Sequence, residues 1–201
     1  MKKVLICLIG SFLFFPALGQ ENSGGREKEN YFYVGPVDLI FNTLELGYER
    51  KLHNNNSFVV LGGFKLSKKD DIINRMGGNG ELQYRINLLY NKEAVNGVVK
   101  KYSTFAYFAP FIQYRYEDIT DMTVNDDNVQ QQTHTIVNSA FGGLGFGFRL
   151  TALESRFCAN FFAGGGLKYS DVTGLLRYTN FLETGYTGIA PKFGLQLGIK
   201  F

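Results

Sequence analysis

The sequence predicts an all-β fold, an eight-stranded antiparallel up-and-down barrel, on three observations. The chain of 201 residues contains 24 Gly, 19 Phe and 12 Tyr, but only four Pro and no Trp. Aromatic residues favour strands, while this much glycine disfavours helices and suits turns and crowded barrel interiors. Eight stretches alternate apolar and polar residues with a period of two, which is the pattern of a half-buried strand. The last of these stretches alternates without an error up to the final residue.

This C-terminal stretch defines two faces. One face carries Phe193, Leu195, Leu197, Ile199 and Phe201, and the other carries Lys192, Gly194, Gln196, Gly198 and Lys200. The remaining seven strands are predicted at residues 33–41, 43–52, 57–66, 80–90, 103–116, 135–150 and 156–169. The first is the weakest prediction, because Pro36 suits only a strand start or an edge.

The predicted connections mostly alternate between short and long. His53–Asn56 and Thr151–Ser155 are short, and Ser67–Asn79, Glu117–Thr133 and Ser170–Gly185 are long. Short turns on one side and long loops on the other are typical of membrane barrels, and an even strand count places both termini on one side.

The N-terminal segment predicts export. Lys2 and Lys3 precede an apolar stretch that is too short to span a bilayer, and small residues follow Pro16. We therefore expect residues 1–19 to be a signal peptide, residues 20–30 a flexible N-terminal tail, and residues 31–201 the barrel. The formal net charge of +3 gives no electrostatic argument for nucleic-acid binding.

The polar face of the strands carries charges of both signs in mid-strand, and the other face is rich in tyrosine. The charges predict a lumenal network formed by Glu45, Glu49, Glu81, Arg85, Arg115, Arg149 and Lys168. Such a network would fill an eight-stranded barrel, whose interior is only wide enough for side chains. Tyrosines near strand ends suit a lipid–water interface. The alternative is a soluble barrel with these tyrosines in its core, but the pattern together with the export signal favours the outer membrane.

Three segments carry a resemblance to a known family. The terminal segment Lys192–Phe201, together with Tyr48–Arg50 and Gln113–Tyr116, resembles small eight-stranded outer-membrane barrels of the OmpA/OmpX type, particularly uncharacterised ones of Bacteroidetes. The resemblance covers roughly residues 31–201 and implies fold and location. It also implies that the barrel-assembly machinery recognises Phe193, Leu195, Leu197, Ile199 and Phe201, and that outer-membrane lipid and lipopolysaccharide surround the protein.

No motif predicts catalysis, a cofactor or a metal site, so we do not expect an enzyme. His134 and Ser139 form the one conceivable nucleophile and base, and a polar strand end is the better interpretation. The acidic cluster of Glu117, Asp118, Asp121, Asp126 and Asp127 is expected in one solvated outer loop. The glycine-rich run Gly142–Gly147 has no helix after it and is expected in a strand, and Cys158 is expected to pack in the lumen.

Three functions remain open at this point. The first is a structural, interaction or surface-binding barrel, and the second is a narrow porin-like or ligand-binding transport barrel. The third, less favoured, is an outer-membrane lipid-modifying enzyme.

Overall fold

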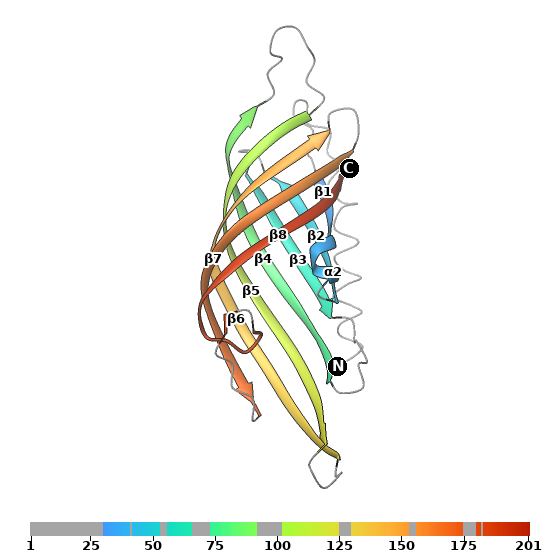
Figure 1. The fold of residues 1–201 in the computed structure, drawn as a ribbon. Helices are drawn as coiled ribbons and strands as arrows, with labels where there is room; N and C mark the ends of the chain where they lie inside the picture. Colours follow the sequence, from blue (N-terminus) through green and yellow to red (C-terminus); the bar gives the residue numbers. More distant parts are fainter. Residues whose placement is uncertain are drawn as a thin grey trace.

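The computed structural model describes residues 30–40, 42–52, 56–65, 73–91, 102–124, 130–152, 156–174, 180–181 and 183–201. Its eight strands form one closed antiparallel barrel in which each strand pairs with its neighbours in the sequence and β1 pairs with β8 (Figure 1). The elements are β1 (Asn30–Gly35), α2 (Pro36–Ile40), β2 (Thr43–Lys51), β3 (Ser57–Lys65), β4 (Ile73–Asn91), β5 (Tyr102–Val124), β6 (Gln130–Ala152), β7 (Phe157–Thr173) and β8 (Gly188–Lys200). The predicted all-β, eight-stranded, up-and-down barrel is confirmed. Residues 1–29, with the expected signal peptide and most of the expected tail, lie outside the described residues, and Asn30 already belongs to β1.

Both ends of the described chain meet at one end of the barrel, which we call the terminal end. The amide N of Asn30 donates to the Phe201 carbonyl at 3.2 Å, and the amide N of Phe201 donates to the Asn30 carbonyl at 3.0 Å. The wall is uneven at the opposite end. The strands β1 to β3 have 6, 9 and 9 residues, while β5 and β6 have 23 each and extend furthest at the bottom of Figure 1.

The predicted first strand, residues 33–41, was wrong in both position and length. The strand ends at Gly35, and the helix α2 begins at Pro36. Proline has no amide hydrogen for a strand ladder and its fixed φ suits the first turn of a helix, and Asp38 places a carboxylate in that turn. Asn42, with φ of 56°, then turns the chain back into β2.

The long predicted loops were also wrong in extent. β4 starts at Ile73 rather than near residue 80, and β5 and β6 stay paired as far as Val124 and Gln130. Main-chain pairing therefore continues after the apolar alternation ends, and a search for apolar alternation misses it. As a result Glu117, Asp118 and Asp121 lie in β5 and not in an acidic loop. Asp126 and Asp127 lie outside the described residues.

The outer surface of the barrel is mainly apolar, and the interior mixes charged side chains with apolar ones. Phe146, Phe157 and Phe193 point outward with 60%, 66% and 66% of their surface exposed, whereas Arg85 and Glu49 are buried in the lumen together with apolar residues such as Leu61. Large exposed apolar rings outside and buried charges inside are unlike a water-soluble barrel, in which apolar side chains fill the interior. No helix in the described part of the chain is long and apolar enough to cross a membrane.

Glycine allows β6 and β7 to approach closely. A methyl group on Gly143 would clash with the main chain of Gly165, and one on Gly166 would clash with the carbonyl oxygen of Gly142. Gly143 and Gly166 are register partners, so the two strands are in contact through their main chains at this point. The glycine-rich run is thus strand, as predicted, and gives close packing between strands.

Candidate functional site

A buried ion cluster fills the lumen in the half of the barrel near the terminal end. Glu49 on β2 accepts hydrogen bonds from Arg85 Nη1 at 2.7 Å and from Arg149 Nη2 at 2.5 Å. Tyr33 donates its hydroxyl to the same carboxylate at 2.8 Å. Arg85 and Glu49 are 0% and 1% exposed, so these charges compensate each other out of contact with water.

Polar and aromatic side chains complete this cross-section. Asn160 accepts from the Tyr107 hydroxyl at 2.8 Å and donates to Gln196 at 2.9 Å, and Gln196 in turn accepts from Arg85 Nη2 at 3.2 Å. The guanidinium of Arg85 lies 4.7 Å from the centre of the Tyr107 ring. We call this group the lumenal plug; its members are Tyr33, Glu49, Arg85, Tyr107, Arg149, Asn160 and Gln196. It draws on seven of the eight strands and is buried throughout, so it closes the lumen.

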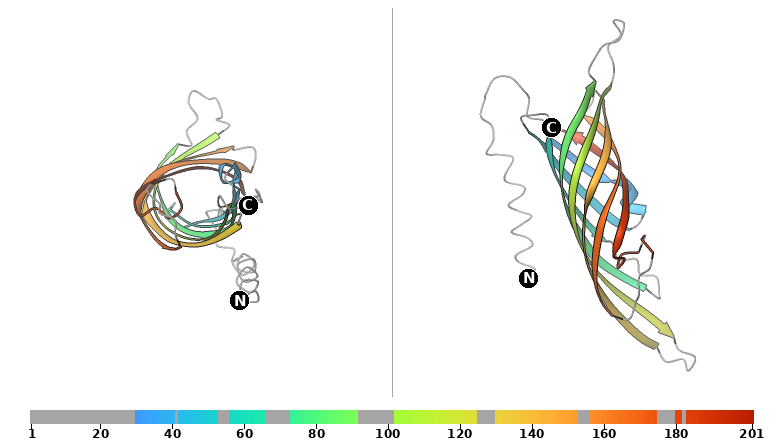
Figure 2. Two further views of the ribbon diagram at one scale, coloured as in Figure 1. Left: turned by 60° about the horizontal axis from the view of Figure 1, so that its bottom comes forward. Right: turned by 90° about the vertical axis from the view of Figure 1, so that its left-hand side faces the viewer.

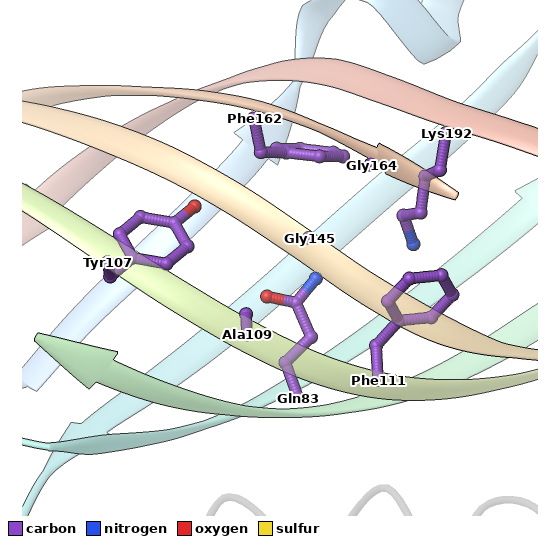
Figure 3. A pocket seen from close by; sticks show the side chains of 8 residues that line it. All are labelled: Gln83, Tyr107, Ala109, Phe111, Gly145, Phe162, Gly164 and Lys192. Atoms are coloured by element: carbon purple, nitrogen blue, oxygen red, sulfur yellow. The ribbon is translucent and has the colours of Figure 1, made fainter. Parts of the chain in front are cut away.

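A second layer lies next to the plug, toward the opposite end. Lys192 on β8 is ion-paired with Glu81 on β4, and Gln83 donates to Glu81 at 2.6 Å. Figure 3 shows Gln83, Tyr107 and Lys192 around a small cavity of about 10 Å³, with the Phe111 and Phe162 rings beside it. This volume holds about one water molecule, so the layer is nearly solid.

Beyond this layer the lumen widens into a cavity of about 900 Å³, which we call the cup. α2 and the ends of the strands away from the termini surround it. Five cationic and three acidic side chains line it, in addition to several aromatic rings. The charged lining consists of Lys65, Arg75, Arg115, Lys168, Lys192, Asp38, Glu45 and Glu117.

Partners in the wall compensate only part of this charge. Lys65 Nζ lies 3.0 Å from Glu117 Oε1, and Arg115 Nη1 lies 3.9 Å from the same oxygen. Lys168 Nζ donates to the main-chain carbonyl of Glu183 at 3.0 Å.

The predicted charge network divides between these levels. The structure brings Glu49, Arg85 and Arg149 into contact and links Glu45 to them through Gln196, whose amide donates to Glu45 at 3.0 Å. Glu81 lies in the second layer, and Arg115 and Lys168 lie in the cup, separate from the plug.

The predicted charge network left out several lumenal residues, although alternation in the last strand already places two of them, Lys192 and Gln196, on its polar face. They are Tyr33, Lys65, Tyr107, Glu117, Asn160, Lys192 and Gln196. Most of them occupy the same inward positions, two residues apart, as the charges in the predicted network, so the period of two is the signal that identifies them. Glu117 was missed because it was assigned to a loop.

The other named residues lie on the outer wall or pack in the lumen. Phe193, Leu197, Ile199 and Phe201 point outward with roughly half or more of their surface exposed, and Leu195 is half-buried on the same face. Cys158 is buried beside Tyr31 and Tyr33, with its thiol free.

The conceivable catalytic pair does not form. Ser139 is buried in the lumen, whereas His134 is exposed on the outer wall and has Nε2 2.7 Å from Asp118 Oδ1. The two side chains thus lie on opposite faces of β6. Among the described residues, no group of three His, Cys, Asp or Glu side chains is arranged to hold a metal ion.

No protein-family model, curated protein or solved structure matches this chain. The plug, the cup and the outer wall are therefore the features from which a function can be inferred.

Proposed function

We propose that this protein is a non-conducting β-barrel of the bacterial outer membrane, of the small OmpA/OmpX type, and that it presents the cup to the cell exterior as a binding site. The terminal end then faces the periplasm, in keeping with an N-terminal signal peptide. The observation that carries the proposal is the division of the lumen into a solid plug and an open cup. A barrel built in this way holds a ligand but does not pass one through.

The height of the outer apolar band supports the membrane location. Outward positions are apolar or aromatic over 106–116 on β5, 140–150 on β6 and 189–199 on β8. Each range is about 11 residues long, the length of a tilted strand that crosses a bilayer. Polar side chains follow directly beyond the band, namely Asp118 on β5, Asn138 on β6 and Asp171 on β7.

Tyrosines mark both edges of this band. Tyr48 and Tyr84 lie toward the terminal end, and their hydroxyls contact the polar side chains of Asn30 and Asn56 at 3.1 Å and 3.0 Å. At the other edge the Tyr114 hydroxyl donates to Asn138 at 2.9 Å. Tyrosine with a buried ring and a hydrated hydroxyl is typical of membrane interfaces.

The experiment uses the full chain expressed in a Gram-negative host. We expect the mature protein to fractionate with the outer membrane and to migrate differently on a gel before and after heating. In planar bilayers the wild-type protein should be silent, and an Arg85→Ala/Arg149→Ala variant that keeps the heat-dependent shift should show ion flux. A soluble, detergent-independent monomer would contradict the membrane location, and steady wild-type conductance would contradict the plug.

The partners follow from the same proposal. The barrel-assembly machinery would recognise the terminal strand through Phe193, Leu195, Leu197, Ile199 and Phe201, and lipopolysaccharide would pack against the outer band. Enzymatic activity is not proposed, because His134 and Ser139 lie on opposite faces of their strand.

A further inference from the structure

The barrel wall is incomplete beside the cup. β8 starts at Gly188, yet β1 pairs with it only from Leu197 to Lys200, because β1 ends at Gly35. Further from the terminal end α2 takes the place of the strand, and it contacts β2 on one side and β8 on the other. Figure 2 (left) shows α2 at the edge of the ring formed by the strands. We call the side of β8 that faces α2 at residues 188–196 the wall gap, because these residues pair with β7 on their other side but have no strand partner here.

The cup reaches the outer surface through this gap. On β5 the cup is lined only by inward-facing residues two positions apart, Gln113, Arg115 and Glu117. On β8 the lining is continuous and includes Pro191 and Phe193, which face outward. Ile40 on α2, which is 77% exposed, also lines the cup, so the cavity reaches exposed side chains on both sides of the wall gap. The cup is therefore open sideways as well as at its end.

The cup favours an anion. Its lining carries five cationic and three acidic side chains, and one of the cations, Lys192, is already paired with Glu81 in the second layer. Among the described residues Lys168 has no carboxylate partner, and Arg115 shares Glu117 with Lys65 at the longer distance of 3.9 Å. Both cations have donor capacity left for a ligand, and a carboxylate or phosphate is the group that such donors bind best.

The gap favours an apolar chain. Phe141 and Phe162 line the cup, and α2 contributes Val37 and Ile40, of which Ile40 is 77% exposed. Phe193 stands on the other side of the gap, 66% exposed. An apolar segment that leaves the cup here stays in contact with apolar side chains and, if the barrel is in a bilayer, passes directly into lipid.

We propose that the cup binds an anionic amphiphile, with its headgroup on Lys168 and Arg115 and its acyl chain leaving through the wall gap. This inference rests on the proposed membrane location and names the class of ligand that the site takes. The headgroup chemistry is shared by free fatty acids and by anionic phospholipids of the surrounding leaflet.

The headgroup is tested with spin-labelled stearic acid added to the full-length barrel in nanodiscs of neutral phosphatidylcholine. A nitroxide near the carboxylate should give an immobilised spectral component that a label near the methyl end does not show. Lys168→Ala should weaken binding roughly tenfold or more, as expected for the loss of one hydrogen bond to a charged group. Arg50→Ala, an exposed cation at the terminal end, is the matched control and should change nothing.

The chain path is tested with tryptophan, because the natural sequence contains none. A Phe193→Trp variant should be quenched saturably by a fatty acid brominated near its methyl end. The control is Phe146→Trp, which is 60% exposed and lies in the same register row, since Phe146 pairs with Ala163 and Ala163 with Phe193. Folding of each variant is checked beforehand by its heat-dependent gel shift.

The outcomes separate the two proposals. Binding of the methyl ester as tightly as the acid, equal quenching at both tryptophans, or full competition by acetate or inorganic phosphate would overturn the amphiphile site. Competition by phosphatidylglycerol would support the site and identify a membrane lipid as the source of the ligand. If phosphatidylglycerol does not compete but the free acid binds, the ligand is a fatty acid. Ligand binding by a protein that does not fractionate with the outer membrane would refute the location and leave the binding site standing.

Discussion

The charge count of the lumenal plug leads to an asymmetric prediction. Glu49 is the single acid between Arg85 and Arg149, and both guanidinium groups donate to it. Glu49→Gln keeps the shape of the side chain but leaves two buried cations without a counter-charge. Removing one partner of a buried ion pair costs about 3–5 kcal/mol, and we expect this loss in the free energy of unfolding.

Arg149→Met should cost much less. It removes one of the two cations and leaves Glu49 paired with Arg85 at 2.7 Å. It also removes a buried donor that is not satisfied, since Arg149 Nε has no hydrogen-bond partner among the described residues. The losses are the hydrogen bond that Arg149 Nη2 donates to Glu49 at 2.5 Å, the stacking of the guanidinium on Tyr31 at 4.6 Å, and some packing volume. Removal of the excess buried cation offsets part of them, and we expect a net cost of about 1–2 kcal/mol.

The measurement is urea unfolding of the barrel folded in detergent, followed by circular dichroism and by the heat-dependent gel shift. Arg156→Gln, an exposed cation near a turn, serves as the control and should stay within about 0.5 kcal/mol of the wild type. If Arg149→Met destabilises the barrel as much as Glu49→Gln does, charge balance does not govern the plug and the reasoning fails.

Two further predictions address other parts of the barrel. Gly166→Ala should destabilise it by about 1–3 kcal/mol in the same assay, whereas Gly145→Ala should be tolerated, because a methyl group there meets nothing nearer than 3.6 Å. Phe201→Ala should lower the amount of heat-shifted protein in the outer membrane, and Phe201→Tyr should not; equal loss in both would argue against recognition of the terminal aromatic ring.

The fold could be predicted from the sequence because a strand that faces different surroundings on its two sides alternates strictly. Phe193 to Phe201 carry this signal without an error, and it identifies the outward face. The same logic fails where both sides of a strand are polar. Asp118 and Asp121 lie in β5, although the sequence assigns them to a loop, since hydrogen bonding to β6 holds them there without an apolar face.

The site could be predicted only as a list of inward charges. Alternation states that Glu49, Arg85 and Lys168 point into the lumen, but it does not give their height along the barrel axis. Height depends on register and strand tilt, which place Arg85 beside Glu49 in the plug and Lys168 far from both in the cup. The separation of plug and cup, on which the proposed function depends, therefore becomes visible only in the structure.

Two prolines explain why the wall gap stays open. Pro36 ends β1 and starts α2, so the strand that would cover the rest of β8 turns away at this residue. Pro191 lies in the uncovered part of β8 and has no amide hydrogen to offer to another strand. An exposed strand edge normally invites pairing, and proline is one of the devices that prevent it. Since neither side of the gap offers a donor at these positions, closing it by strand pairing would leave carbonyl groups unsatisfied. An opening that the sequence maintains from both sides is better suited to admitting a ligand from the side than to a purely structural wall.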